Sequence, residues 1–101
     1  MILFNITCHI EKIINLEFKD WVISSYLPKI NEVDFVNNTT FLKLLTEIDD
    51  QTFTYSIQIS FEAMQYYTQF QLENETKFLE EIQQKFNEKI FTFTTLLEKM
   101  H

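Results

Sequence analysis

The sequence contains no glycine and a single proline, Pro28, among its 101 residues. Loops that cradle phosphate groups need the close backbone approach and the positive φ angles that glycine supplies. Nucleotide-binding loops of the Walker and Rossmann types are therefore not expected in this chain.

Cysteine and histidine are almost as scarce, because Cys8 is the only cysteine and the histidines are His9 and the last residue, His101. One thiol cannot form an internal disulfide, and a zinc site needs about four cysteine or histidine ligands. We therefore predict no metal site and no cofactor, although carboxylate-bound calcium or magnesium stays open on counting alone. We interpret Cys8 as a buried core residue.

Positive charge is also in short supply, with 8 Lys and Arg against 15 Asp and Glu and a net charge of −7. No basic stripe offsets this charge, so binding of nucleic acid is not expected. No apolar run is long enough to span a membrane. The N-terminal stretch lacks the leading positive charge and the cleavage site of a signal peptide, so a cytoplasmic location is predicted.

Apolar residues make up 46% of the chain and include eleven Phe, enough for one domain spanning residues 1–101 with its own core. The stretch Thr52–Phe61 alternates with period two, which indicates a strand with one buried face. Its apolar positions are Phe53, Tyr55, Ile57, Ile59 and Phe61. Residues 2–10 show the same alternation.

The remaining segments are predicted to form two helices and two further strands. Asn15 is placed to cap a first helix, which should end or bend near Leu27 because proline removes a helix hydrogen bond. Ser60 is placed to cap a second helix over about residues 62–86, in which a break at 69–76 is possible. A strand at about 40–48, a turn at 49–51 and a strand at about 89–98 complete the chain. Asn87 is expected to adopt the left-handed conformation at the end of the second helix.

The predicted order is strand, helix, strand, strand, helix, strand. Two right-handed crossovers joined by a hairpin give an α+β, ferredoxin-like βαββαβ sandwich. We predict a four-stranded antiparallel sheet of order 4-1-3-2 with both helices on one face.

The other sheet face is the candidate site, because it collects neutral polar side chains. These are Asn5, Thr7, His9, Thr54, Ser56, Gln58, Thr92 and Thr94. Such a face is often simply solvated. The alternative is a homodimer in which two such faces enclose a polar pocket. The predicted second strand, apolar on both sides, also favours a partner subunit.

Two side chains could add acid–base chemistry to this face. His9 could act as a base or donor, although an exposed ion pair with Glu11 is the simpler interpretation. Tyr26 could place a phenol at the mouth of the pocket, although packing is the commoner role. Four acidic residues, Glu73, Glu75, Glu80 and Glu81, indicate a solvated helix face.

Several short strings resemble a family of small bacterial proteins known only as a domain of unknown function. They are Asn5-Ile6-Thr7 with Ile10-Glu11, Trp21 with Leu27-Pro28, Tyr55-Ser56-Ile57-Gln58, and Phe86-Asn87-Glu88-Lys89 leading to Phe93-Thr94-Thr95-Leu96-Leu97-Glu98. The family is similar to the dimeric α+β barrel proteins, which include small monooxygenases and isomerases. The resemblance implies the ferredoxin-like fold and a dimer.

The chain departs from the family pattern at three places. Tyr26 stands where the family commonly has His, Thr94 where it has Arg, and Asn87-Glu88 where it has a Gly pair. The first two differences call into question any family reaction or anion site.

Three functions stay open. The favoured one is a dimeric, non-catalytic module that binds a small ligand or is structural, with no catalytic residue. The others are a protein-interaction domain that uses an edge strand or the acidic helix, and a small cofactor-independent enzyme of the dimeric barrel type.

Overall fold

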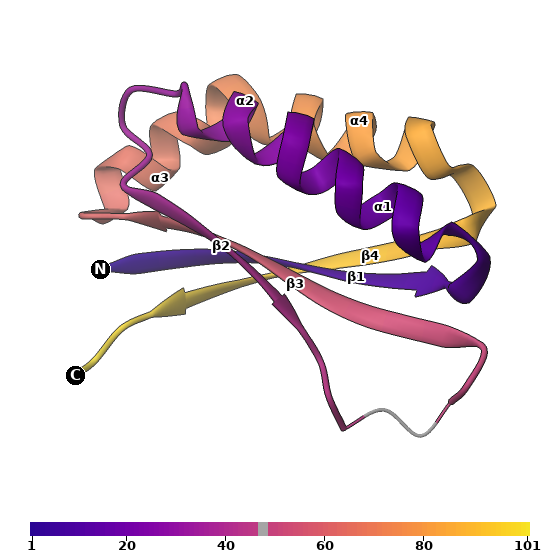
Figure 1. The fold of residues 1–101 in the computed structure, drawn as a ribbon. Helices are drawn as coiled ribbons and strands as arrows, with labels where there is room; N and C mark the ends of the chain where they lie inside the picture. The colour runs from indigo at the N-terminus through magenta and orange to yellow at the C-terminus, as the bar shows by residue number, and fades with distance from the viewer. Residues whose placement is uncertain (47–48) are drawn as a thin grey trace.

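The computed structural model describes residues 1–46 and 49–101, and it places two long helical segments on one face of an antiparallel sheet (Figure 1). The strands are β1 (Ile2–Glu11), β2 (Asn38–Lys43), β3 (Thr52–Phe61) and β4 (Ile90–Glu98). They lie in the order β2-β3-β1-β4, which is the predicted order 4-1-3-2. The ferredoxin-like sandwich is therefore confirmed, with β1 and β3 in the centre of the sheet.

The first helical segment follows β1 and runs to Asn31. It consists of the 3-10 turn η1 (Lys12–Ile14), α1 (Asn15–Trp21), the π-helical turn η2 (Val22–Tyr26) and α2 (Leu27–Asn31). The predicted cap at Asn15 is wrong, because Ile14 is the N-cap and makes no side-chain cap bond. The Asn15 Oδ1 atom instead accepts a hydrogen bond of 2.6 Å from the Tyr55 hydroxyl.

Pro28 does not end this helical segment at Leu27. Of the two predicted outcomes, an end or a bend near Leu27, the end is wrong, and the helix type changes there from η2 to the short helix α2. Immediately before Pro28, the Leu27 N–H bonds to the carbonyl of Val22, five residues back, as in a π-helix. Proline is tolerated in the first turn of a helix, where its missing N–H costs little, and Pro28 is the second residue of α2. The wider π-turn thus lets the chain restart a helix around the proline.

The second helical segment also contains a π-helical turn. It comprises α3 (Met64–Phe70), η3 (Gln71–Glu75) and α4 (Thr76–Phe86), followed by the 3-10 turn η4 (Asn87–Lys89). The break proposed for 69–76 therefore corresponds to a change of helix type. Ser60 is not the cap: it belongs to β3, its hydroxyl bonds to the Asn38 carbonyl, and Ala63 occupies the N-cap.

The β2–β3 pairing confirms the predicted hairpin, but β2 is shorter than the predicted strand and starts earlier. The Asp49 carboxylate accepts a 2.8 Å bond from the Gln51 N–H and orders the turn before β3. The predicted end of the strand, Ile48, lies outside the described residues. Leu42 and Leu44 remain 45% and 48% exposed, so their side of this strand is uncovered in the single chain.

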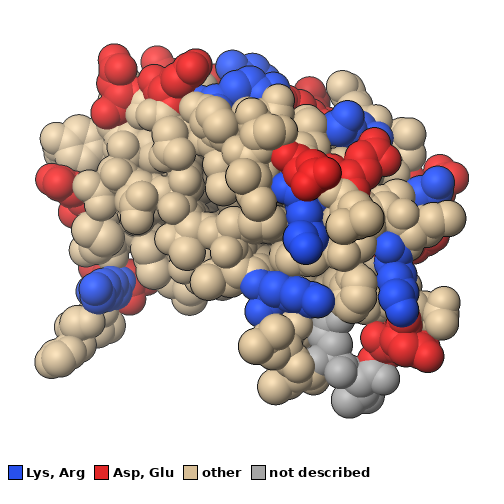
Figure 2. Space-filling view, viewed as in Figure 1, with Lys and Arg blue, Asp and Glu red and all other residues tan. Residues whose placement is uncertain are grey.

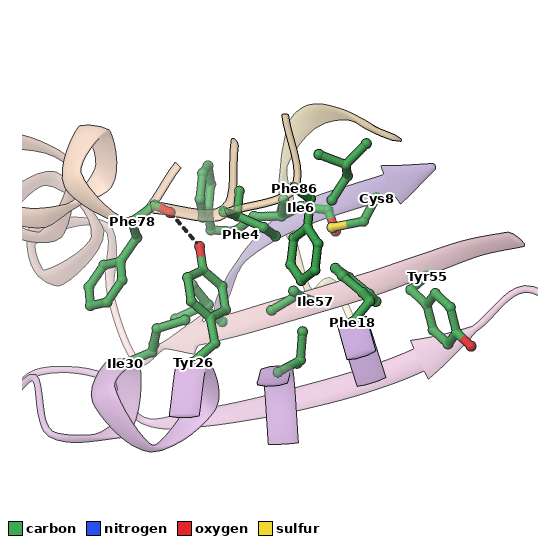
Figure 3. Close-up of a cluster of buried hydrophobic side chains, with 14 of the residues drawn as sticks. Phe4, Ile6, Cys8, Phe18, Tyr26, Ile30, Tyr55, Ile57, Phe78 and Phe86 are labelled. Carbon is green, nitrogen blue, oxygen red and sulfur yellow. Dashed lines mark hydrogen bonds between the residues drawn. The ribbon is translucent and has the colours of Figure 1, made fainter. Parts of the chain in front are cut away.

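The core lies between the sheet and the two helical segments and consists mainly of aromatic and isoleucine side chains (Figure 3). Phe18 contacts Phe86 and Tyr55 with ring centroids 5.5 Å apart in each case. Phe70 contacts Phe61 at 5.3 Å and stacks on Phe78 at 6.0 Å. Cys8 is fully buried in this core, as predicted, and burial raises the pKa of its thiol to about 12.

Asn87 is the one described residue with a positive φ, at 52°, and its ψ is −130°. The positive φ was expected, but the ψ of −130° lies outside the left-handed helical region, so the predicted cap conformation is wrong in this angle. A side chain at this φ and ψ strains the backbone by about 1–3 kcal/mol. We expect Asn87→Gly to raise the free energy of unfolding by about 1 kcal/mol, because glycine adopts this conformation without a steric penalty. Chemical denaturation measures the change.

The matched control for this substitution is Glu88→Gly at the next, exposed position. Glycine there relieves no positive φ and adds only flexibility to the unfolded chain, so it should lower stability by about 0.5–1 kcal/mol. If both variants change stability in the same direction, the strain at Asn87 has been misjudged.

Candidate functional site on the open sheet face

The sheet face away from the helices, called here the open face, is bare in the single chain (Figure 1). On the two central strands the register pairs Asn5 with Gln58, Thr7 with Ser56 and His9 with Thr54. Residues paired across an antiparallel ladder point to the same face, and the intervening residues of both strands are buried under the helices. These six predicted site residues are therefore brought together as one polar band.

Most of the polar band is joined by hydrogen bonds. The Asn5 Nδ2 atom donates to the Thr7 hydroxyl at 2.9 Å, and the Ser56 hydroxyl donates to the Asn5 Oδ1 atom. His9 Nδ1 lies 2.8 Å from the Thr54 hydroxyl oxygen. Within the described residues His9 forms no ion pair with Glu11, so the simpler interpretation of this histidine is wrong.

Thr92 and Thr94 do not belong to the polar band, and this part of the prediction is wrong. They pair with Cys8 and Ile6, whose side chains are buried on the helix-covered face. The open face of β4 instead carries the alternate residues of the strand. These are Phe91, Phe93, Thr95 and Leu97.

Apolar side chains therefore flank the polar band on both edge strands. On β4, Phe91, Phe93 and Leu97 are 63%, 51% and 45% exposed. On β2, Leu42 pairs with Ser56 on the open face, and Leu44 follows it at the same side of the strand. The Phe91 and Phe93 rings lie 6.2 Å apart on one edge, and exposed apolar side chains gathered in this way mark binding or association sites.

A hollow of about 480 Å³ lies over the band, on the β2 side. Its lining residues are Thr7, Leu42, Lys43, Leu44, Thr54, Tyr55, Ser56 and Gln58. The β2–β3 hairpin bends away from the helices (Figure 1), so Leu42 and Leu44 form a wall beside a floor of hydroxyl and amide groups. The volume falls within the range of small-molecule sites, although the hollow is open to solvent in the single chain.

Charged side chains lie mostly elsewhere on the molecule. Figure 2 shows Lys, Asp and Glu along the helix layer, near the hairpin end and near the C-terminus. Lys43 borders the hollow, but its ammonium group lies 4.1 Å from the centre of the Phe53 ring, on the helix-covered side. Lys29 and Glu81 form an exposed ion pair between α2 and α4.

The described residues contain no group of three His, Cys, Asp or Glu side chains that could hold a metal ion. Among the described helices, none combines the length and the apolar character needed to cross a membrane.

Tyr26, the predicted residue at the pocket mouth, lies instead in the core between helix and sheet. Its ring is fully buried and stacks on Trp21 at 4.6 Å, and its hydroxyl donates a 2.7 Å hydrogen bond to the Phe78 carbonyl (Figure 3). The phenol thus connects the two helical segments and does not reach the open face. The commoner interpretation, packing, is correct.

Tyr26→Phe is expected to lower the free energy of unfolding by about 1–3 kcal/mol, because it leaves the Phe78 carbonyl without this buried donor. Burial also raises the pKa of Tyr26 above its ordinary value of about 10. The hydroxyl therefore stays protonated in the folded protein at pH values where the unfolded chain ionises. Its stabilising effect is complete below pH 10 and is lost as pH rises further.

Denaturation at neutral pH and above pH 10 tests both effects. The Tyr26→Phe variant should be less stable at neutral pH and should lose less stability than the unaltered protein in alkali. Tyr66→Phe, at an exposed tyrosine, is the control and should change little. An unchanged alkaline loss in the Tyr26 variant would contradict the burial of its phenol.

The element order and the strand order define an α+β protein of the ferredoxin-like type. The chain belongs to the family described as a domain of unknown function (DUF4286), whose model matches residues 1–100. The resemblance noted in the sequence is thereby confirmed. No curated protein matches the chain.

Two solved structures share the fold. One is an ethyl tert-butyl ether d (EthD) family protein from Bacillus halodurans, with 12% identity, a TM-score of 0.70, and coverage of 99% of this chain and 100% of that one. The other is named as a candidate antibiotic biosynthesis monooxygenase from Deinococcus radiodurans. It has 12% identity and a TM-score of 0.70, and the match covers 100% of this chain and 94% of the other. At this identity the likeness establishes the fold alone.

Proposed function

We propose that the protein is a homodimeric, non-catalytic small-molecule-binding module whose two open faces meet and enclose the polar band. The observation that carries the proposal is the hollow of about 480 Å³, which is lined mainly by neutral side chains and bordered by exposed apolar side chains of the same face. The dimer belongs in the cytoplasm, as the sequence indicates.

Charge supports a second copy as the cover of this face. Each chain carries a net charge of −7, so two copies repel each other over most of their surface. The central part of the open face contributes almost none of this charge. It is therefore the surface on which two acidic chains meet with least repulsion, and the meeting buries Phe91, Phe93 and Leu97.

Light scattering over a range of protein concentration tests the dimer, and native mass spectrometry of the same sample tests for a retained small molecule. We expect twice the mass of the chain at low micromolar concentration. A monomer at high micromolar concentration contradicts the proposal and favours a protein-interaction domain that uses the outer edges of β2 and β4.

An enzyme of the dimeric barrel type is the second candidate, favoured by the monooxygenase name of one structural neighbour. His9 is the histidine that the open face offers, with one ring nitrogen bonded to Thr54. His9→Ala should leave the dimer and its ligand in place if the module is non-catalytic. If the protein is an enzyme, the same variant should retain the ligand and lose its conversion to product.

A further inference from the structure

Gln58 lies half-buried in the centre of the polar band, on β3, opposite Asn5 on β1 and Thr40 on β2. Its neighbours Asn5, Thr7 and Ser56 satisfy one another through hydrogen bonds. Within residues 1–46 and 49–101, the Gln58 amide makes no hydrogen bond to another side chain or to the backbone. The floor of the hollow therefore offers one carbonyl oxygen and one NH₂ group that are free to bind a ligand.

The hollow supplies no charge to balance an ionised ligand. Lys43 and Tyr55 are among its lining residues, but the Lys43 ammonium lies over the Phe53 ring on the helix-covered side of the sheet. The rest of the lining consists of hydroxyl, amide and leucine side chains. Enclosing a phosphate, carboxylate or ammonium group there would leave that charge unpaired, which is costly. The chemistry of the lining therefore favours an uncharged ligand.

A primary amide presents a donor and an acceptor side by side in one plane. Its complement is an N–H next to a carbonyl in a planar ring, the edge that lactams and imides carry, and the two edges form paired hydrogen bonds. The flat face of such a ring suits the apolar wall of Leu42 and Leu44. We propose that the hollow binds uncharged planar lactams and imides, with Gln58 pairing to their N–H and C=O edge.

This inference rests on the proposed function, because a second copy must close the hollow to exclude water from the paired amides. Closure matters because hydrogen bonds exposed to solvent contribute little net affinity, whereas enclosed polar groups left unpaired are penalised. The same reasoning predicts strong discrimination against a ligand that lacks the N–H donor.

The test uses three bicyclic probes of similar size: 2-quinolone, N-methyl-2-quinolone and quinoline-2-carboxylate. The first carries the lactam edge, the second lacks its donor, and the third is an anion. Calorimetric titration into the purified full chain should give a Kd for 2-quinolone at least about tenfold lower than for either of the others. Equal binding of the N-methyl compound, or tighter binding of the carboxylate, overturns the inference.

Gln58→Met keeps the length of the side chain and removes the amide. It should abolish the preference for 2-quinolone over its N-methyl derivative, while the control Gln69→Met, at an exposed position of α3, should preserve it. Light scattering on the same samples separates a failure of the ligand class from a failure of the proposed dimer. A dimer that binds none of the lactams overturns only the ligand class, whereas a monomer overturns the proposed function and this inference with it.

Discussion

Phe93→Glu is expected to weaken the homodimer by about 100-fold or more, so that the variant is monomeric at concentrations where the unaltered protein is a dimer. Phe93 is 51% exposed on the open face of β4 and pairs with Thr7 in the polar band. In the proposed dimer the glutamate enters the interface twice, once from each copy, and neither carboxylate has a partner. Burying unpaired like charges costs several kcal/mol, and each 1.4 kcal/mol corresponds to about tenfold in Kd.

Thr94→Glu is the matched control, because it adds the same charge one residue further along the same strand. Thr94 pairs with Ile6, so its side chain lies on the opposite face of β4, where it is exposed. The control should remain a dimer under the conditions that separate the Phe93 variant. Sedimentation or light scattering measures both, and circular dichroism checks that both are folded. If both variants dissociate equally, the interface does not use the open face.

The fold was predictable because period-two alternation and a helix–hairpin–helix order leave few topologies. The alternation of Thr52–Phe61 matches the alternating burial of β3, and the strand order follows from the crossover rule. The caps were not predictable in the same way. Asn15 and Ser60 are good cap residues by type, but each makes a tertiary hydrogen bond instead, with Tyr55 and with the Asn38 carbonyl.

The candidate site was predictable on the central strands and not on the edge. In β1 and β3 one set of alternate residues is strongly apolar, so the other set can be assigned to the open face from the sequence alone. In β4 both alternate sets contain apolar residues, and Phe91 and Phe93 are of a residue type that is usually buried. The register is instead set by the pairing of Ile90 with Ile10 after the turn at Asn87. A shift of one residue moves every side chain to the other face.

The course of the first helical segment beyond Trp21 could not be predicted from the sequence either. The sequence around Tyr26 and Pro28 indicates an α-helix that ends or bends near Leu27. In the structure the π-helical turn η2 continues the helical segment into α2, and Tyr26 is buried in the core. A π-turn shifts the helical face by one residue, and no single residue type signals it. The role of Tyr26 therefore depended on the tertiary structure.

Phe18→Ala is expected to lower the free energy of unfolding by about 3–5 kcal/mol, the range for removing a buried aromatic ring. Phe18 is fully buried at the meeting point of α1, β3 and α4, with ring contacts to Tyr55, Phe86 and Phe41. The loss is a large fraction of the total stability of a small domain, about 5–15 kcal/mol. Denaturant titration measures it, and Phe18→Leu should lose less because it leaves a smaller cavity.

Leu16→Ala is the control for this prediction, since Leu16 lies in the same helix α1 but is 71% exposed. Surface substitutions of this kind change stability by no more than about 0.5 kcal/mol. The helix propensity of alanine is at least as good as that of leucine, so α1 itself is not weakened. A loss at Leu16 close to that at Phe18 would contradict the assignment of the buried side and would mean that another surface covers the outer face of α1. Because the open face lies beyond the sheet, neither substitution should alter dimer formation in molecules that remain folded.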